Sequence, residues 1–157
     1  MLAKRVIVPL LLASIVLPAC VGTTQAAPQQ KPPAENAFTD QDASALLRQL
    51  SEALEGHSQK KLLALFDLSQ IKDSALFKQQ ISLFFAQAES IRVHLNLVET
   101  NTENERPAFA VDAEMEVEPT NGGPVVRQNE RLTFTVAKTS SGWKFIEVQP
   151  RSFFSLP

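Results

Sequence analysis

The sequence predicts an α+β domain in which three N-terminal helices pack on a curved four-stranded antiparallel sheet. Two observations predict this fold class. Apolar residues recur at helical spacing up to about Ala88, and after Ser90 they alternate with polar residues. Short turn segments separate the alternating runs, which favours antiparallel neighbours because parallel strands need long crossovers. The helices then cover one face of the sheet, and the other face meets water.

The first 19 residues are predicted to be a lipoprotein signal peptide. Lys4 and Arg5 precede an apolar run over residues 6–17, which is too short for a membrane-spanning helix and typical of a signal-peptide core. The sequence then continues Leu17-Pro18-Ala19-Cys20, which resembles the lipobox of bacterial lipoproteins. The resemblance implies cleavage before Cys20 and attachment of lipid to its sulfur.

Cys20 is the only cysteine, so it cannot form a disulfide within the chain. An anchor of several acyl chains binds a bilayer almost permanently, so the first predicted partner is a membrane. Val21 follows the cysteine, and by resemblance to lipoproteins of two-membrane bacteria it favours the outer membrane, facing the periplasm. The alternative is ordinary cleavage after Ala26 and a protein secreted to the periplasm.

Residues 20–37 are predicted to be a disordered linker behind the lipidated cysteine. They contain Pro28, Pro32 and Pro33 with several Gln and Ala residues, and they have few large apolar side chains to bury. A proline-rich segment of this kind acts as an extended tether. Residues 38–157 then form the folded domain.

Local signals place the three predicted helices. Thr39-Asp40-Gln41-Asp42 has the form of a capping box, and Gly56 is suited to end the first helix. Ser58 can begin a second, shorter helix, and Asp73 or Ser74 can begin a third. The third helix carries a wide aromatic stripe that is more typical of a core than of a cofactor site.

Four strands follow. The second is the clearest, because its apolar and acidic residues alternate strictly. The third covers about Val125 to Ala137 and the fourth Trp143 to Gln149, with turns at residues 121–124 and 140–142. The predicted inward residues of the second strand are Phe109, Val111, Ala113, Met115 and Val117, and those of the third are Val126, Leu132, Phe134 and Val136.

The order and spacing of these elements from Phe38 to Phe154, with the closing run Gly142-Trp143-Lys144-Phe145-Ile146-Glu147-Val148, resemble the nuclear transport factor 2-like (NTF2-like, also SnoaL-like or cystatin-like) domain. The resemblance implies a cone-like fold and, as in many members, a homodimer formed through the sheet. The family often has a hairpin between its second and third helices. Residues 67–73 leave no room for it, which implies a reduced pocket rim.

A small apolar ligand could lie between the third helix and the sheet. In the commoner alternative, the same side chains simply form the core. The candidate ligand-binding residues are Phe77, Ile81, Phe84, Phe85, Val111, Met115 and Phe134.

Catalytic and metal-binding candidates are few. His94 with Asp112 is the best candidate for a catalytic pair, but the alternation of the strands puts both on the solvent-facing side of the sheet. His57 lies at a helix end. No residues have metal-ligand spacing, so we expect no metal and no cofactor. The acidic residues of the second strand are expected to pair with Arg127 and Arg131 on the third. With no acid or base in the interior, we expect no catalytic residue and no enzyme.

These observations favour a lipid-anchored, non-catalytic interaction module of the cell envelope, which binds another envelope protein or a second copy of itself. The alternative is a binder of a small apolar ligand or lipid, and an isomerase-like or dehydratase-like enzyme is less favoured. The chain has 15 basic and 17 acidic residues, and Lys60-Lys61 is its only basic pair beyond the signal peptide. Nucleic acid is therefore not an expected partner.

Overall fold

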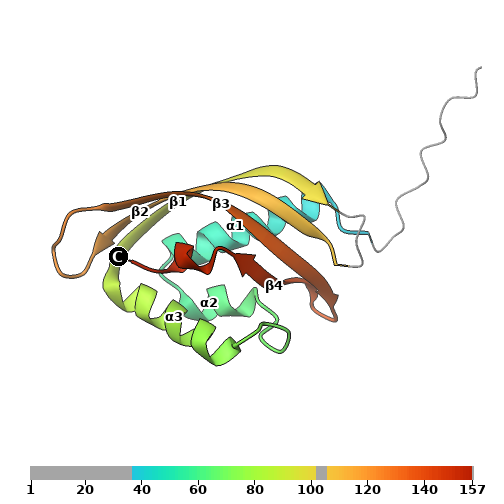
Figure 1. The fold of residues 1–157 in the computed structure, drawn as a ribbon, viewed down its shortest axis with the longest axis horizontal. Coiled ribbons are helices and arrows are strands. Elements are labelled where there is room, and N and C mark those ends of the chain that lie inside the picture. The colour runs from blue at the N-terminus through green and yellow to red at the C-terminus, as the bar shows by residue number, and fades with distance from the viewer. Residues whose placement is uncertain (1–36, 102–105, 157) are drawn as a thin grey trace, which may run out of the picture. The chain divides into compact units, whose positions relative to one another are not determined.

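The structure is a computed structural model that describes residues 37–101 and 106–156 (Figure 1). The predicted signal peptide, Cys20 and nearly all of the linker lie outside the described residues. The remaining chain contains three α-helices, four strands and a short C-terminal 3-10 helix, in that order. None of the helices in these two ranges is long and apolar enough to cross a membrane.

The helices are α1 (Asp40–Glu55), α2 (Gln59–Ala64) and α3 (Ser74–Gln87). The capping box at Thr39 is confirmed, because its side chain accepts from the Asp42 amide and the Asp42 carboxylate accepts from the Thr39 amide. Gly56 ends α1 and Ser58 caps α2, as predicted. These caps satisfy backbone groups that would otherwise lack partners at the helix ends.

The strands are β1 (Ala88–Asn101), β2 (Ala108–Pro119), β3 (Val126–Thr139) and β4 (Gly142–Gln149). They form one antiparallel sheet in the order β1-β2-β3-β4, which confirms the predicted meander. The sheet curves over the helices, which all lie on its concave side (Figure 1). The α+β fold class is therefore confirmed.

The core lies between the concave face and the helices. Phe38, just before α1, stacks on Phe109 with ring centroids 5.6 Å apart and meets the edge of Trp143 at 5.0 Å. Phe109 also stacks on Phe134 at 5.4 Å. These aromatic contacts bury large apolar areas and fix the start of α1 against the sheet.

The C-terminal segment, residues 151–156, was not predicted as an element. It begins with the 3-10 helix η1 (Arg151–Phe154) and runs beneath the sheet, between the strands and the helices (Figure 1). Phe153 and Phe154 are both fully buried. Residues 153 and 154 therefore help to fill the inside of the cone.

Candidate functional site

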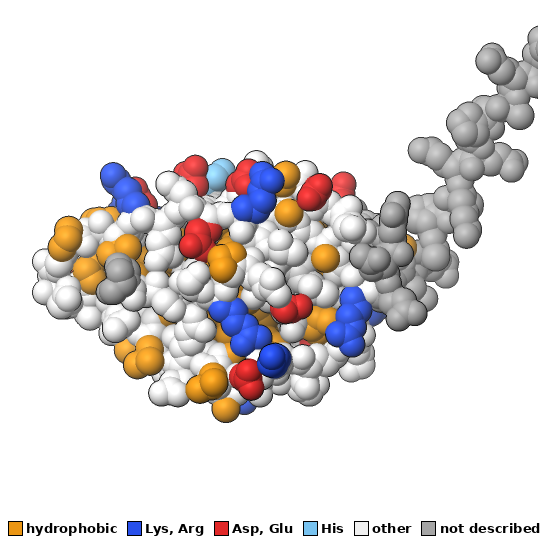
Figure 2. All heavy atoms as spheres, in the orientation of Figure 1, with side chains coloured by type: hydrophobic (Ala, Val, Ile, Leu, Met, Phe, Trp, Pro, Cys, Tyr) orange, Lys and Arg blue, Asp and Glu red, His pale blue; other side chains and the backbone are white. Residues whose placement is uncertain are grey.

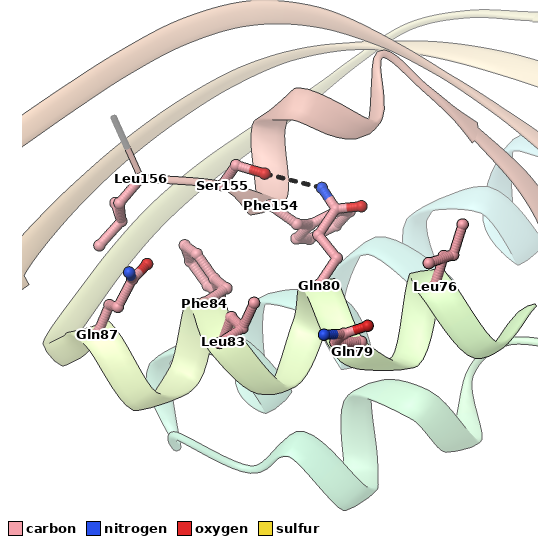
Figure 3. Close-up of a pocket in the computed structure, with 9 residues that line it drawn as sticks. All are labelled: Leu76, Gln79, Gln80, Leu83, Phe84, Gln87, Phe154, Ser155 and Leu156. Carbon is pink, nitrogen blue, oxygen red and sulfur yellow. Dashed lines mark hydrogen bonds between the residues drawn. The ribbon is translucent and has the colours of Figure 1, made fainter.

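A groove lies between α3 and the C-terminal segment (Figure 3). Its volume is about 370 Å³, which is within the range of small-molecule sites. One wall is a face of α3, and the other is the end of the chain. The groove is lined by Leu76, Gln79, Gln80, Leu83, Phe84, Gln87, Phe154, Ser155 and Leu156.

The groove is uncharged and lined by both apolar and polar side chains. Leu76 is 66% exposed and Leu83 is 54% exposed, although both are large aliphatic side chains. Gln79, Gln80 and Gln87 supply amides, and no lining side chain is ionisable. In the space-filling view, charged side chains lie along the upper edge and also around the lower centre, and apolar side chains show at the lower left (Figure 2).

Two glutamines hold the C-terminal wall in place. The Nε2 of Gln80 donates to the Arg151 carbonyl at 2.6 Å and to Ser155 Oγ at 2.9 Å (Figure 3). From the sheet, Gln128 Nε2 donates to the Ser155 carbonyl at 2.8 Å. The guanidinium of Arg151 donates to the Lys72 carbonyl at 2.9 Å. The groove wall is thus fixed by specific hydrogen bonds as well as by buried phenylalanines.

The predicted ligand-binding residues all belong to one hydrophobic cluster. The structure brings together every one of them, and each is buried. Among them, only Phe84 also lines the groove of Figure 3. The space between α3 and the sheet is filled by large side chains such as Phe77, Phe134 and Phe154. Ligand binding by these predicted residues therefore stays a prediction. The groove of Figure 3 lies beside them and shares only Phe84 with them.

The outer face of the sheet carries the polar residues that were expected there. His94 pairs in register with Glu114, and Asp112 pairs with Asn96 on one side and Arg131 on the other. His94 and Asp112 are both exposed, so the predicted strand parity of β2 is confirmed. They are not direct partners, and they do not meet in a pocket.

Arginines of β3 pair with acids of β2, as predicted. Arg131 Nε donates to Asp112 at 2.9 Å, and Arg127 Nε donates to Glu116 at 2.7 Å. The hydrogen bond from Arg131 lowers the pKa of Asp112 below its ordinary value. These exposed pairs contribute little to stability individually.

His57 lies at the end of α1 in a left-handed backbone conformation, with φ of 51°. Its ring meets the edge of the Phe85 ring, with centroids 5.1 Å apart. This placement agrees with the structural role expected at a helix end.

A second, shallower hollow of about 540 Å³ lies between α2, the following loop and the β3–β4 turn. Its one acid, Asp67, accepts from Ser69 and Gln70, and these hydrogen bonds lower the pKa of the Asp67 carboxyl. The carboxylate is already satisfied by its own loop. Residues 37–101 and 106–156 contain no group of three or more His, Cys, Asp or Glu side chains that could hold a metal ion.

Two polar residues on the inner face of β3 were not among the predicted site residues. Gln128 pairs in register with Met115, and Glu130 pairs with Ala113, whose side chains are both buried under the sheet. Directly paired residues point to the same face of a sheet. Gln128 and Glu130 therefore point inward and are half-buried, whereas no polar or charged residue among residues 37–101 and 106–156 is fully buried.

No protein-family model matches the sequence, and no curated protein matches it. Solved structures do match the fold. A scytalone dehydratase candidate from Novosphingobium aromaticivorans superposes with a TM-score of 0.61 at 15% identity, covering 69% of this chain and 79% of that one. An NTF2-like superfamily protein from Salmonella enterica serovar Typhimurium gives 0.61 at 10% identity, covering 69% and 86%. A hexachlorocyclohexane dehydrochlorinase gives 0.53 at 11% identity, covering 70% and 86%.

These likenesses establish the NTF2-like fold, as the sequence resemblance implied. They also overturn the expectation that the chain is not an enzyme, because the same fold is found in proteins named for dehydratase and dehydrochlorinase activities. That expectation rested on strand parity, which did not consider Glu130, a half-buried carboxylate that points to the inner face.

Proposed function

We propose that this chain is a lipid-anchored protein of the cell envelope that binds a fatty acyl chain in the groove between α3 and the C-terminal segment. The observation that carries the proposal is the exposure of Leu76 and Leu83 in a groove without charges. The predicted lipidation of Cys20 supports the cellular setting, and the groove supports the ligand class.

Leu76 and Leu83 lie two helical turns apart, on the same side of α3. Both leave most of their surface to water, at a hydrophobic cost of roughly 25 cal/mol per Å² of apolar area. Leu156, on the C-terminal segment, lies at the Gln87 end of the groove, and Leu76 lies at the other end (Figure 3). A long apolar ligand along this groove would remove all three side chains from water.

The lining chemistry favours a ligand whose buried part is uncharged. A charged group there would lose hydration without gaining an opposite charge. An acyl chain needs no such partner, and the amides of Gln79 and Gln87 can bind a polar end such as an ester or a hydroxyl. Attachment at Cys20 would hold the groove within tether reach of a bilayer, which is a source of acyl chains.

Photo-crosslinking in cells tests the ligand. Cells expressing the full chain would be fed a fatty acid carrying a diazirine and an alkyne, irradiated, and analysed by peptide mass spectrometry. We expect crosslinks in residues 76–87 and 154–156. The double substitution Leu76→Gln, Leu83→Gln should lower this labelling at least about fivefold, because both apolar contacts are lost.

Val98→Gln is the matched control, because Val98 is also an exposed apolar residue but lies on β1, outside the groove. Its labelling in residues 76–87 should equal that of the wild type. Labelling spread evenly over the surface, or labelling unchanged in the double variant, would contradict the acyl-chain proposal. Crosslinks from α3 to a second copy of the chain or to another envelope protein would instead favour a protein partner.

A separate experiment tests the anchor. Membrane and soluble fractions would be compared for the wild type and Cys20→Ser, with attached acyl groups identified by mass spectrometry of the N-terminal peptide. We expect acylated Cys20 in the wild type, recovered in outer membranes, and release of the variant into the periplasm. An unmodified Cys20, or unchanged retention of the variant, would refute lipidation without affecting the groove.

A further inference from the structure

We propose that Gln128 and Glu130, on the inner face of β3, bind a primary ammonium group. The two residues are separated by Asn129 along the strand, so their Cα atoms are about 7 Å apart and their side chains point to the same face. They are separate from the groove of Figure 3, because neither lines it. The proposal therefore stands whether or not the groove binds an acyl chain.

Two acceptor atoms at this place lack donors. Gln128 Oε1 and Glu130 Oε2 are buried and have no hydrogen-bond partner among residues 37–101 and 106–156. The amide of Gln128 cannot simply be reversed, because its Nε2 already donates to the Ser155 carbonyl at 2.8 Å. Its oxygen is therefore fixed as an acceptor that points away from the C-terminal segment.

Such atoms are uncommon in folded proteins, because a buried polar atom without a partner costs free energy. The carboxylate is the more costly of the two, since it carries charge. A single group that donates to both atoms and carries positive charge would remove both costs. A primary ammonium has three donors on one small cation, so it can donate to Glu130 Oε2 and Gln128 Oε1 together.

A small side chain and an uncovered strand edge adjoin the pair. Ala113 lies opposite Glu130 and projects only a methyl group on the inner face. Pairing with β4 reaches β3 only from Thr133 to Thr139, so β4 does not cover the edge of β3 beside Gln128 and Glu130. Both side chains are half-buried, which gives a ligand a route from solvent.

Ligand-observed NMR on the full chain in detergent micelles tests the proposal. The probe is ¹³C-methylammonium, which is too polar to partition into a micelle. We expect its signal to broaden on adding the wild type. Glu130→Gln, which keeps shape and removes the charge, should weaken the affinity about tenfold or more.

The matched control is Glu114→Gln, which removes the same charge from the outer face of the neighbouring strand. It should bind methylammonium like the wild type, and Gln128→Met should bind more weakly. Two further probes separate the natural sources of the group: glycerophosphoethanolamine stands for a lipid headgroup, and Nα-acetyl-lysine amide stands for a peptide.

The proposal is wrong if methylammonium does not bind, or if Glu130→Gln and Glu114→Gln weaken binding equally. A crystal structure of the methylammonium complex with only water at Gln128 Oε1 and Glu130 Oε2 would overturn it as well. Circular dichroism of each variant would confirm that a loss of binding is not a loss of fold. Failure of the acyl-chain proposal would appear only in the labelling of α3 and residues 154–156, so the two outcomes are distinguishable.

Discussion

Gln128 and Ser155 join the sheet to the end of the chain: the Gln128 amide donates to the Ser155 carbonyl at 2.8 Å. Gln80 binds the same segment from the opposite side, through Ser155 Oγ and the Arg151 carbonyl. The C-terminal segment is thus held between β3 and α3. Because its two phenylalanines are buried, it is part of the core as well as a wall of the groove.

Phe154→Ala should lower the free energy of unfolding by about 3–5 kcal/mol, since it removes a fully buried ring and leaves a cavity. The lost contacts include the rings of Phe77 and Phe84, with centroids 6.4 and 6.3 Å from that of Phe154. Urea unfolding followed by the fluorescence of Trp143, the only tryptophan, measures the change.

The control for this substitution is Leu83→Ala, which also removes a large apolar side chain but from an exposed position. Its effect should stay within about 0.5 kcal/mol. Equal effects of the two substitutions would show that the C-terminal segment is not packed as described.

Gln80→Met keeps the length of the side chain and removes both hydrogen bonds to the C-terminal segment. It should cost about 1 kcal/mol, the usual net value of a side-chain hydrogen bond, and should speed amide hydrogen exchange in residues 151–156. Gln79→Met is the control, because Gln79 lines the groove without a hydrogen bond among the described residues. Equal exchange in the two variants would indicate that Gln80 does not hold the segment.

Much of the fold could be predicted because local signals agree with the tertiary structure. The capping box at Thr39 and the strict alternation of β2 each specify one arrangement, and packing confirms both. The 3-10 helix η1 gave no such signal. It is four residues long, and the adjacent pair Phe153-Phe154 has neither a helical nor an alternating period.

The inner polar pair was missed for a different reason. Leu132 points inward, and side chains alternate along a strand, so Glu130 and Gln128 must also point inward. The prediction assigned only hydrophobic residues to the inner face and therefore did not include them. Register is set by the strand as a whole, because a slip of one residue would expose Leu132 and Phe134. Parity along the strand, and not the hydrophobicity of each residue, therefore predicts which face a polar residue occupies.

Thr39→Ala should destabilise the domain by about 0.5–2 kcal/mol, because it removes the side-chain acceptor for the Asp42 amide. The loss also frees the Asp42 carboxylate from the Thr39 hydroxyl, which lies 2.7 Å away. Ser44→Ala, at an exposed position inside α1, is the control and should leave the melting temperature nearly unchanged. If both substitutions have the same effect, the cap does not stabilise α1.

The Asp112–Arg131 pair should make part of the stability dependent on pH. Arg131 lowers the pKa of Asp112 in the folded protein, so the pair stabilises the fold above the unfolded-state pKa of about 3.9. This contribution is lost as the pH falls through the lower pKa of the folded state, because protonated Asp112 no longer attracts Arg131. Both side chains are more than half exposed, so the effect is small and weakened by salt.

Arg131→Gln should therefore melt slightly below the wild type at pH 6, and the difference should shrink as the pH falls below about 4. Thermal melts at low ionic strength across this range measure it. Lys78→Gln is the control, because Lys78 on α3 has no ion-pair partner among residues 37–101 and 106–156 and should show no such convergence. A difference between Arg131→Gln and the wild type that stays constant down to pH 2 would mean that Arg131 acts through packing of its aliphatic stem.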